Sequence, residues 1–276
     1  MKKWYAVIGD PIAQSMSPAM HDAWFKENGI DASYIPVRVK SEDLEKTVAS
    51  LKQLGCSGWN VTVPHKTAII PFLDEVDEAA KQMNAVNTVC VMEDGTLYGT
   101  NTDGRGFYRS LEEVYPEEVI DRSILMIGAG GAASGIAFAL HEAGCRSLTF
   151  TNRTVEKAQQ LQGKYPDATV LSIEEAEAMV NQYSLLVQTT SVGMNYAQSG
   201  MPLNPTGIHK DTIVADIIYN PLETEFLHQA RISGGRTVNG IGMFVHQGAL
   251  AFELWTGIYP DTTTMIQTIS EKLGGN

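Results

Sequence analysis

Apolar and polar residues alternate along the first hundred positions in a pattern that predicts strands and helices in turn. The expected strands are 5–8, 34–39 and 58–63, and the expected helices are 18–27 and 42–54. A helix over about 74–83 and a hairpin of 87–92 with 96–100, turning at Asp94-Gly95, complete this part of the chain. Strands that alternate with helices are typical of βα units, so we expect a mostly parallel sheet.

The same alternation returns after an expected linking helix at 104–113. The expected strands are now 124–127, 147–151, 168–171, 185–189, 212–217 and a short one at Thr237, with helices around 136–140, at 155–164, after Asn220-Pro221 and twice at the end. The run 240–255 is apolar on nearly every face, so we expect it between two lobes or packed back onto the first. The pattern predicts an α/β protein of two lobes with a ligand-binding cleft between them.

Length and charge narrow the class of protein. With 276 residues the chain is long enough for two domains. Its net charge of −12 argues against a nucleic-acid or anionic-membrane partner, which calls for a basic face. The N-terminus has no long apolar stretch or cleavage site, and no run approaches about 18 apolar residues, so we expect a cytoplasmic protein.

The cysteines and histidines give no metal-binding pattern. Cys56, Cys90 and Cys145 are odd in number and far apart, which favours free thiols in a reducing compartment. None of the six histidines forms a His-x-x-x-His pair. We therefore expect no metal site.

A glycine-rich turn follows the apolar strand 124–127 and precedes an apolar helix. It reads Gly128-Ala129-Gly130-Gly131-Ala132-Ala133, which is the Gly-x-Gly-x-x-Ala fingerprint of dinucleotide binding in its required setting. The next strand ends at Asn152, where an NAD-specific site carries Asp or Glu. Because Asn152 does not repel a 2′-phosphate and Arg153 can donate a forked pair of hydrogen bonds to it, the sequence predicts NADP(H) as the cofactor.

Polar groups that could hold the substrate lie at strand ends of the first lobe. Ser15 and Ser17 precede Pro18 at the start of an expected helix, where they can hold a carboxylate. The alternative is local, with Ser17 as a helix N-cap and Pro18 at the first helical position. The sequence leaves both interpretations open.

A lysine and an aspartate stand at the ends of neighbouring strands. Lys66 follows the strand 58–63, and Asp103 closes the polar run Thr100-Asn101-Thr102-Asp103-Gly104 after the hairpin. Such residues can be a solvated lysine and a helix N-cap. Together in a partly dry site, however, they suit alcohol oxidation, because the hydroxyl must lose a proton as its carbon loses a hydride.

Seven motifs, taken in order over the whole chain, resemble shikimate dehydrogenases. They are Ser-Met-Ser-Pro at 15–18, Asn-Val-Thr-Val-Pro-His-Lys at 60–66, Asn-Ala-Val-Asn-Thr at 84–88, Asn-Thr-Asp-Gly at 101–104, Gly-Ala-Gly-Gly-Ala-Ala at 128–133, Asn-Arg-Thr at 152–154 and Asp-Ile-Ile-Tyr-Asn-Pro at 216–221. The resemblance implies reversible NADP-dependent interconversion of shikimate and 3-dehydroshikimate, in aromatic amino-acid biosynthesis.

The resemblance also implies roles for individual residues of the substrate site. Lys66 would be the general acid and base, with Asp103 beside it. The implied substrate contacts are Ser15 and Ser17 at the carboxylate, Thr62, Asn87 and Asp103 at the ring hydroxyls, and Tyr219 and Gln247. Gln247 is an amide in an apolar helix and needs a partner, which could instead be a backbone group.

On the cofactor side the resemblance implies several further contacts. The implied contacts are Gly128, Ala129, Gly130, Gly131 and Ala132 at the pyrophosphate, Asn152, Arg153, Thr154 and Lys157 near the 2′-phosphate, Thr190, Ser191, Val192, Gly193 and Met194 along the cofactor, Ile217, Gly240 and Met243 around the nicotinamide, and Glu78. Lys157 can instead be a solvated helix charge. His65, at a position that is often Phe or His in the family, could influence pH dependence or merely pack.

The implied organisation is a substrate-binding and catalytic domain over 1–103, a Rossmann-type NADP-binding domain over 104–239 and C-terminal helices over 240–276 that pack back on the first domain. Two other functions stay open at this point. One is a quinate/shikimate dehydrogenase that tolerates NAD, and the other is a non-catalytic NADP(H)-responsive regulator. We expect a monomer or a homodimer.

Overall fold

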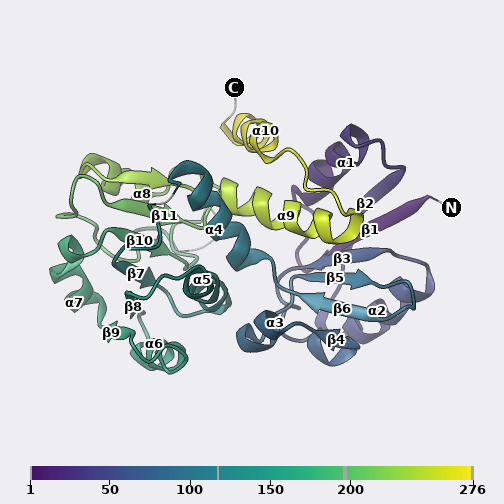
Figure 1. Cartoon of the computed structure of the whole chain (residues 1–276), viewed down its shortest axis with the longest axis horizontal. Coiled ribbons are helices and arrows are strands. Elements are labelled where there is room, and N and C mark those ends of the chain that lie inside the picture. Colours follow the sequence, from purple (N-terminus) through teal and green to yellow (C-terminus); the bar gives the residue numbers. More distant parts are fainter. Residues whose placement is uncertain (1, 117, 195–197, 275–276) are drawn as a thin grey trace. The chain divides into compact units, whose positions relative to one another are not determined.

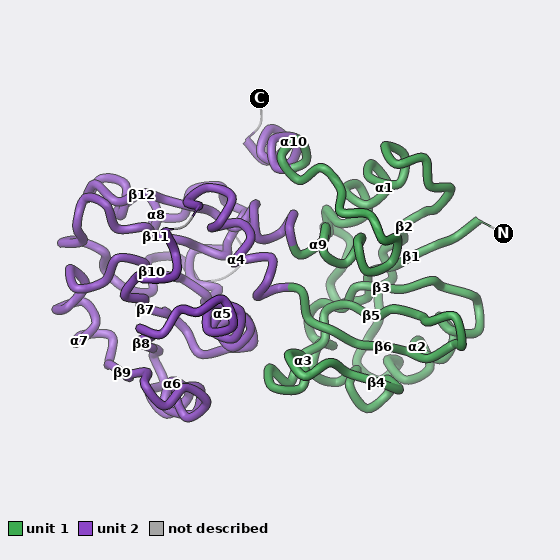
Figure 2. The backbone as a smooth tube through the Cα atoms, in the orientation of Figure 1, with its two compact units in different colours: residues 1–102, 247–265 green, residues 103–246, 266–276 purple. Residues whose placement is uncertain are grey.

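The computed structural model describes residues 2–116, 118–194 and 198–274. The chain forms two compact units (Figure 2). Unit 1 comprises 1–102 and 247–265, and unit 2 comprises 103–246 and 266–276. The last 30 residues are thus shared, with 247–265 in unit 1 and 266–276 in unit 2.

Unit 1 is built on a six-stranded mixed sheet in the order β2-β1-β3-β5-β6-β4 (Figure 1). Its strands are β1 (Lys3–Gly9), β2 (Ala32–Arg38), β3 (Gly58–Val61), β4 (Glu75–Val76), β5 (Thr88–Val91) and β6 (Leu97–Thr100). The pairs β1·β2, β1·β3 and β4·β6 are parallel, whereas β5 is antiparallel to both of its neighbours, β3 and β6. The expected hairpin is therefore confirmed as β5 and β6.

Helices cover both faces of this sheet because successive residues of β1 point to opposite sides. The helical segments of unit 1 are α1 (Ser17–Glu27), η1 (Ser41–Asp43), α2 (Leu44–Gln53), η2 (Ile70–Phe72) and α3 (Glu78–Met83). Ala6 and Ile8 share an apolar cluster with Val48 and Leu51 of α2. On the other face, Tyr5 stacks on Phe25 of α1 at 5.2 Å and on Trp255 at 4.9 Å between ring centroids.

Unit 2 is built on a six-stranded sheet in which every pair is parallel. Its strands are β7 (Ile124–Ile127), β8 (Leu148–Thr151), β9 (Thr169–Leu171), β10 (Leu185–Gln188), β11 (Ile213–Asp216) and β12 (Arg236–Val238). They run in the order β12-β11-β10-β7-β8-β9 (Figure 2). This is the doubly wound dinucleotide-binding order, in which the chain reverses direction across the sheet between β7 and β10.

The helices of unit 2 lie on both sides of that sheet, and two helices are shared with unit 1. The helical segments are α4 (Asp103–Val114), α5 (Gly131–Glu142), α6 (Val155–Gln162), α7 (Ile173–Ala178), η3 (Val180–Gln182), α8 (Glu225–Ile232), α9 (Ile241–Thr256) and α10 (Thr262–Gly274). Phe107 and Leu111 of α4 and Ile136 and Leu140 of α5 belong to one apolar cluster. The expected α/β class and Rossmann-type sheet are confirmed.

The structure corrects the helix expected over 74–83. Residues 75 and 76 form β4, and α3 begins only at Glu78. The backbone N–H of Asp74 and of Asp77 donate to carbonyls of the β6 region, at 3.0 and 2.9 Å. The Asp77 carboxylate then accepts from Ala80 N at 2.7 Å and caps the helix. Because the N–H groups of Asp74 and Asp77 are hydrogen-bonded to β6, the helix cannot start earlier.

Two global features follow from the helices and the cysteines. In the described part of the chain, no helix combines the length and the apolar composition needed to cross a bilayer. Cys56, Cys90 and Cys145 are buried free thiols. Burial raises the pKa of Cys56 and Cys90 to about 12 and that of Cys145 to about 11, so all three stay protonated near neutral pH.

Candidate active site and cofactor cavity

The turn after β7 requires glycine at its first position. Gly128 has φ of +110°, and a Cβ there would collide with Thr189 Oγ1. Its N–H donates to Thr151 O at 2.8 Å, and Thr189 Oγ1 donates to Ile127 O at 2.8 Å. The turn is thereby held between the ends of β8 and β10, at the point where the strand order reverses.

Helix α5 presents an open N-terminus beside this turn. Its N-cap is Gly130, with no side-chain hydrogen bond, and a Cβ built on Gly130 or Gly131 would meet no atom within 4 Å. The first N–H groups of a helix attract anions, and small residues let a phosphate approach them. The segment Gly128 to Ala132 therefore fits the pyrophosphate of a dinucleotide.

A cavity of about 350 Å³ lies at this end of the parallel sheet. Six of the residues expected at the cofactor line it, namely Gly128, Asn152, Arg153, Thr190, Ser191 and Val192. The remaining wall comes from Ile127, Ile173, Gln198, Met201 and Pro202. Three separate sequence motifs are thus brought to one cavity, at the carboxyl ends of β7, β8 and β10, where open α/β sheets bind their ligands.

The residues after β8 suit a phosphorylated ribose. Asn152 Nδ2 donates to Thr154 O at 2.7 Å and so shapes the turn into α6. Arg153 and Lys157 have exposed side chains. Within the described ranges, no carboxylate pairs with Arg153, and the neighbouring side chain of Asn152 is uncharged. The guanidinium on the cavity wall is therefore available to an anion. Lys157 and Thr154 do not line the cavity, so their cofactor contacts stay predictions.

The loop after β11 is hydrogen-bonded to the end of β10 and to the segment after β12. Ile217 N donates to Gln188 O at 3.1 Å, and Gly240 N donates to Ile218 O at 2.9 Å. A Cβ on Gly240 would collide with the Ile217 carbonyl, so only glycine allows this approach. Ile217 and Met243 are both half-buried against the same apolar cluster as Ala129. The structure thus groups the residues expected near the nicotinamide within one region of unit 2.

Asp216 anchors the loop that carries Ile217 and Tyr219. Its carboxylate is 1% exposed and accepts from Ile218 N at 2.9 Å and from Thr224 Oγ1 at 2.8 Å. Burial raises the pKa of Asp216 to about 7, against the lowering effect of these two hydrogen bonds. Tyr219 packs on Phe244 of α9 with ring centroids 5.1 Å apart.

In unit 1, Ser15 and Ser17 adjoin the start of α1. Ser17 is not the N-cap that one interpretation expected, because the helix begins at Ser17 and its N-cap Met16 makes no side-chain hydrogen bond. Instead Ser17 N donates to Ser15 Oγ at 3.3 Å, a local turn contact. The hydroxyl of Ser17 is not used for capping, which leaves the carboxylate-binding interpretation in place as a prediction.

The segment after β3 sets Lys66 next to the start of β5. Thr62 N donates to Ile8 O at 3.0 Å, and His65 N donates to Thr62 O at 2.9 Å. The His65 ring is fully buried and lies 2.7 Å from Val39 O, which identifies a packing and anchoring role. Val86 N then donates to Lys66 O at 2.8 Å, so the backbone of Lys66 lies beside that of the residue before Asn87.

Asn87 is the centre of a buried hydrogen-bond network. Its side chain is 2% exposed, donates from Nδ2 to Thr102 Oγ1 at 3.0 Å and accepts from Thr102 N at 2.8 Å. The Thr102 hydroxyl donates to Gln247 O at 3.0 Å. Asp103 follows Thr102 directly and is the first residue of α4. The network therefore fixes the backbone on which Asp103 and Gln247 stand.

The structure groups some of the expected residues within unit 1 and assigns others to unit 2. Thr62, Lys66 and Asn87 gather at the ends of β3 and β5 in unit 1, whereas Asp103 and Tyr219 belong to unit 2. Glu78 is exposed at the first turn of α3 in unit 1. Its contact with the cofactor stays a prediction.

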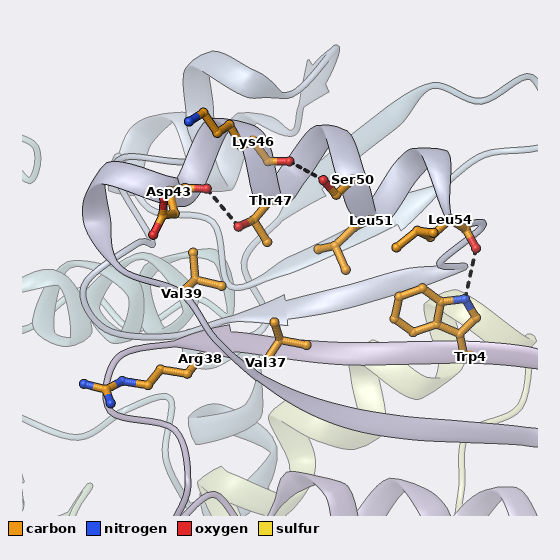
Figure 3. Close-up of a pocket in the computed structure, with 10 residues that line it drawn as sticks. All are labelled: Trp4, Val37, Arg38, Val39, Asp43, Lys46, Thr47, Ser50, Leu51 and Leu54. Carbon is orange, nitrogen blue, oxygen red and sulfur yellow. Dashed lines mark hydrogen bonds between the residues drawn. The ribbon is translucent and has the colours of Figure 1, made fainter.

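A second cavity, of about 460 Å³, lies in unit 1 between α2 and the strands β1 and β2 (Figure 3). Trp4, Val37 and Leu51 form its apolar walls. The Thr47 and Ser50 hydroxyls donate to carbonyls of their own helix, at 2.8 and 2.7 Å. None of the expected site residues lines this cavity, so it is separate from the candidate active site.

Sequence reasoning missed part of the cofactor cavity. Ile173, Met201 and Pro202 come from segments with no motif, and only the fold brings them to the wall. Gln188, which is hydrogen-bonded to the lining residues Thr190 and Val192, could have been noticed in the sequence, because it is a polar residue at the end of the otherwise apolar strand β10. In the described residues, no three His, Cys, Asp or Glu side chains are grouped so as to hold a metal ion.

Three family models match the chain in sequence order. Residues 7–89 match the shikimate dehydrogenase substrate binding domain, 111–217 match shikimate / quinate 5-dehydrogenase, and 240–269 match the shikimate 5′-dehydrogenase C-terminal domain. The matched segments include Ser15, Lys66, Arg153 and Gln247.

Known proteins resemble the chain over its full length. The shikimate dehydrogenase (NADP(+)) of Lysinibacillus sphaericus (strain C3-41) is 54% identical over 276 residues, which is 100% of both chains. A crystal structure of shikimate 5-dehydrogenase from Thermus thermophilus with NADP(H) and shikimate is 35% identical, with a TM-score of 0.87 over 96% of this chain and 97% of that one. Quinate dehydrogenase from Corynebacterium glutamicum, solved with NAD, is 33% identical, with a TM-score of 0.88 over 97% and 98%. The chain therefore belongs to the shikimate dehydrogenase family.

Proposed function

We propose that this protein is an oxidoreductase that catalyses the reversible NADPH-dependent reduction of 3-dehydroshikimate to shikimate, a step of aromatic amino-acid biosynthesis. The observation that carries the proposal is the cavity that Gly128, Asn152 and Arg153 line at the reversal point of a fully parallel sheet. Full-length identity of 54% to an NADP(+)-dependent relative supports the same reaction.

The residues of unit 2 fit NADP(H). The open N-terminus of α5 offers N–H groups to the pyrophosphate, and Arg153 offers a cation to the 2′-phosphate. Thr190, Ser191 and Val192 also line the cavity. Ile217, Gly240 and Met243 would surround the nicotinamide. When bound, NADP(H) accepts or supplies the hydride.

Unit 1 supplies the substrate site in this proposal. Ser15 and Ser17 bind the carboxylate, and Thr62, Asn87 and Asp103 bind the ring hydroxyls. The frame around Asn87 supports this role, because hydrogen bonds to Thr102 hold the buried amide in one orientation. Tyr219 and Gln247 complete the contacts.

Proton transfer falls to Lys66. In the direction of oxidation, its Nζ accepts the proton of the substrate hydroxyl as the carbon gives up its hydride, and in reduction the ammonium returns that proton. Asp103 stabilises the ammonium form and orients the hydroxyl. The proposed domain roles are substrate binding for 1–103, cofactor binding for 104–239 and packing back on the substrate domain for 240–276, of which 247–265 belong to unit 1.

A second candidate is a quinate/shikimate dehydrogenase that tolerates NAD, which the likeness to the Corynebacterium glutamicum enzyme favours. Against it stand Asn152 and Arg153 at the ribose position. Steady-state rates with shikimate or quinate, each with NADP⁺ or NAD⁺, test both candidates. We expect kcat/KM to be highest for shikimate with NADP⁺. Absence of reduced cofactor in all four mixtures would leave the non-catalytic regulator as the remaining function. A cytoplasmic location and a monomer or homodimer stay predictions from the sequence.

A further inference from the structure

Gln188 is a fully buried glutamine at the carboxyl end of β10. The strand before it, 185–187, is apolar, so the amide is an isolated polar group in the interior of the sheet. Burial of an amide is costly unless every donor and acceptor finds a partner. The partners of Gln188 therefore indicate why the residue is tolerated there.

The side-chain hydrogen bonds that Gln188 makes with described residues all go to the loop that follows it. Its Oε1 accepts from Thr190 N at 2.7 Å, and its Nε2 donates to Thr190 O at 3.2 Å and to Val192 O at 3.0 Å. The Thr190 hydroxyl adds one contact within the loop, from Val192 N at 3.2 Å. One side chain thus fixes both ends of the segment 190–192.

The same segment forms a wall of the cofactor cavity. Thr190, Ser191 and Val192 line it together with Gly128 and Arg153, whereas Gln188 does not reach the cavity surface. Residues 190–192 form neither a helix nor a strand, so the shape of the loop depends on side-chain hydrogen bonds such as those of Gln188.

From this geometry we infer that Gln188 is a positioning residue, which sets the affinity for the dinucleotide by holding the loop 190–192 in its binding shape. The inference rests on the proposed function, because it requires that the cavity takes NADP(H). Gln188 acts on the loop and leaves Arg153 untouched, so its loss weakens NADP⁺ and NAD⁺ by the same factor. Loss of Arg153, by contrast, changes the ratio between the two cofactors.

The test compares Gln188→Met with Gln162→Met in the full chain. Methionine keeps the length and burial of the side chain and removes its hydrogen bonds. Gln162 is the matched control, since its Nε2 donates to Ala168 O at 3.2 Å in the same unit, and neither residue lines the cavity. The measured quantities are Kd for NADP⁺ and for NAD⁺ by calorimetric titration, and Tm.

We expect Gln188→Met to raise both Kd values by about ten-fold or more and to leave their ratio unchanged. The reason is that the loop loses several hydrogen bonds, and the loss of one or two such bonds corresponds to about a ten-fold change in affinity. Gln162→Met should lower Tm and leave both Kd values at the wild-type level. If Gln188→Met does not fold, Gln188→Asn replaces it, because the shorter amide cannot span from Thr190 to Val192.

Kd values within two-fold of wild type in the folded variant would overturn the inference, and so would a weakening confined to NADP⁺. Failure of the proposed function looks different. In that case the wild-type protein itself does not bind NADP⁺ in the same titration.

Discussion

Asn87 and Thr102 bind each other through the side-chain amide of Asn87, which donates to the Thr102 hydroxyl at 3.0 Å and accepts from Thr102 N at 2.8 Å. Both residues are buried. The pair joins the start of β5 to the residue before Asp103, and through the Thr102 hydroxyl it reaches the backbone of Gln247. Three positions of the proposed substrate site thus share one buried framework.

Thr102→Val removes the hydroxyl from this framework while keeping the shape of the side chain. The Asn87 amide and the Gln247 carbonyl then lose a buried partner, so we expect the free energy of unfolding to fall by about 1–3 kcal/mol. We also expect a lower kcat, because the backbone before Asp103 is less well fixed. Urea unfolding and steady-state kinetics measure the two effects. Thr102→Ser keeps the hydroxyl and is the control, and equal behaviour of the two variants would refute the role of the hydroxyl.

Lys66→Met removes the proposed acid and base. We expect kcat to fall by about 10²- to 10⁴-fold, the usual contribution of a positioned proton-transfer group. Kd for NADP⁺ should stay within a few-fold of wild type, because the cofactor cavity lies in unit 2. Lys46→Met, on the exposed face of α2 in the same unit, is the matched control. Wild-type turnover of the Lys66 variant would end the assignment.

Arg153→Ala tests the choice of cofactor. Charge-assisted hydrogen bonds to a phosphate contribute about 1.5–3 kcal/mol, so we expect Kd for NADP⁺ to rise by about ten- to a hundred-fold. Kd for NAD⁺ should change little, since it carries no 2′-phosphate. Calorimetric titration of both cofactors measures the ratio. Arg146→Ala, whose guanidinium donates to the His141 carbonyl at the far end of α5, is the control. Equal weakening of both cofactors would contradict the 2′-phosphate contact.

The glycine turn and Asn152-Arg153 could be predicted because each motif carries its chemistry in adjacent residues. The wall made by Ile173, Met201 and Pro202 could not, since those residues meet only when the sheet is assembled.

The apolar pattern also gave a wrong boundary where strand pairing competes with helix formation. The carboxylate of Asp77 caps α3 and its backbone pairs with the β6 region, so a segment that reads as one helix divides into a strand and a helix. Helix α7 was missed because it is only six residues long and has no apolar stripe, although the capping box of Ser172 and Glu175 is a signal that the sequence does carry.

His21 makes the stability of unit 1 depend on pH. Its ring is fully buried among aromatic side chains, stacked on Tyr34 at 4.3 Å, and neither ring nitrogen has a hydrogen-bond partner among the described residues. Burial lowers the pKa of His21 to about 3 from 6.5. The unfolded chain therefore binds a proton at His21 below pH 6.5, whereas the folded chain binds it only near pH 3.

The stability that the neutral His21 ring contributes is therefore fully present above pH 6.5 and is lost as the pH falls from 6.5 toward 3. One group with this shift costs about 3 kcal/mol between pH 6.5 and 4. His21→Leu keeps an apolar side chain in the site and removes the titration, so its free energy of unfolding should fall less steeply with acid than that of the wild type. The control His209→Gln changes an exposed histidine and should leave the slope as it is. Urea unfolding at pH 4, 5, 6 and 7 gives the slopes, and parallel curves for His21→Leu and the wild type would show that His21 titrates normally in the folded protein.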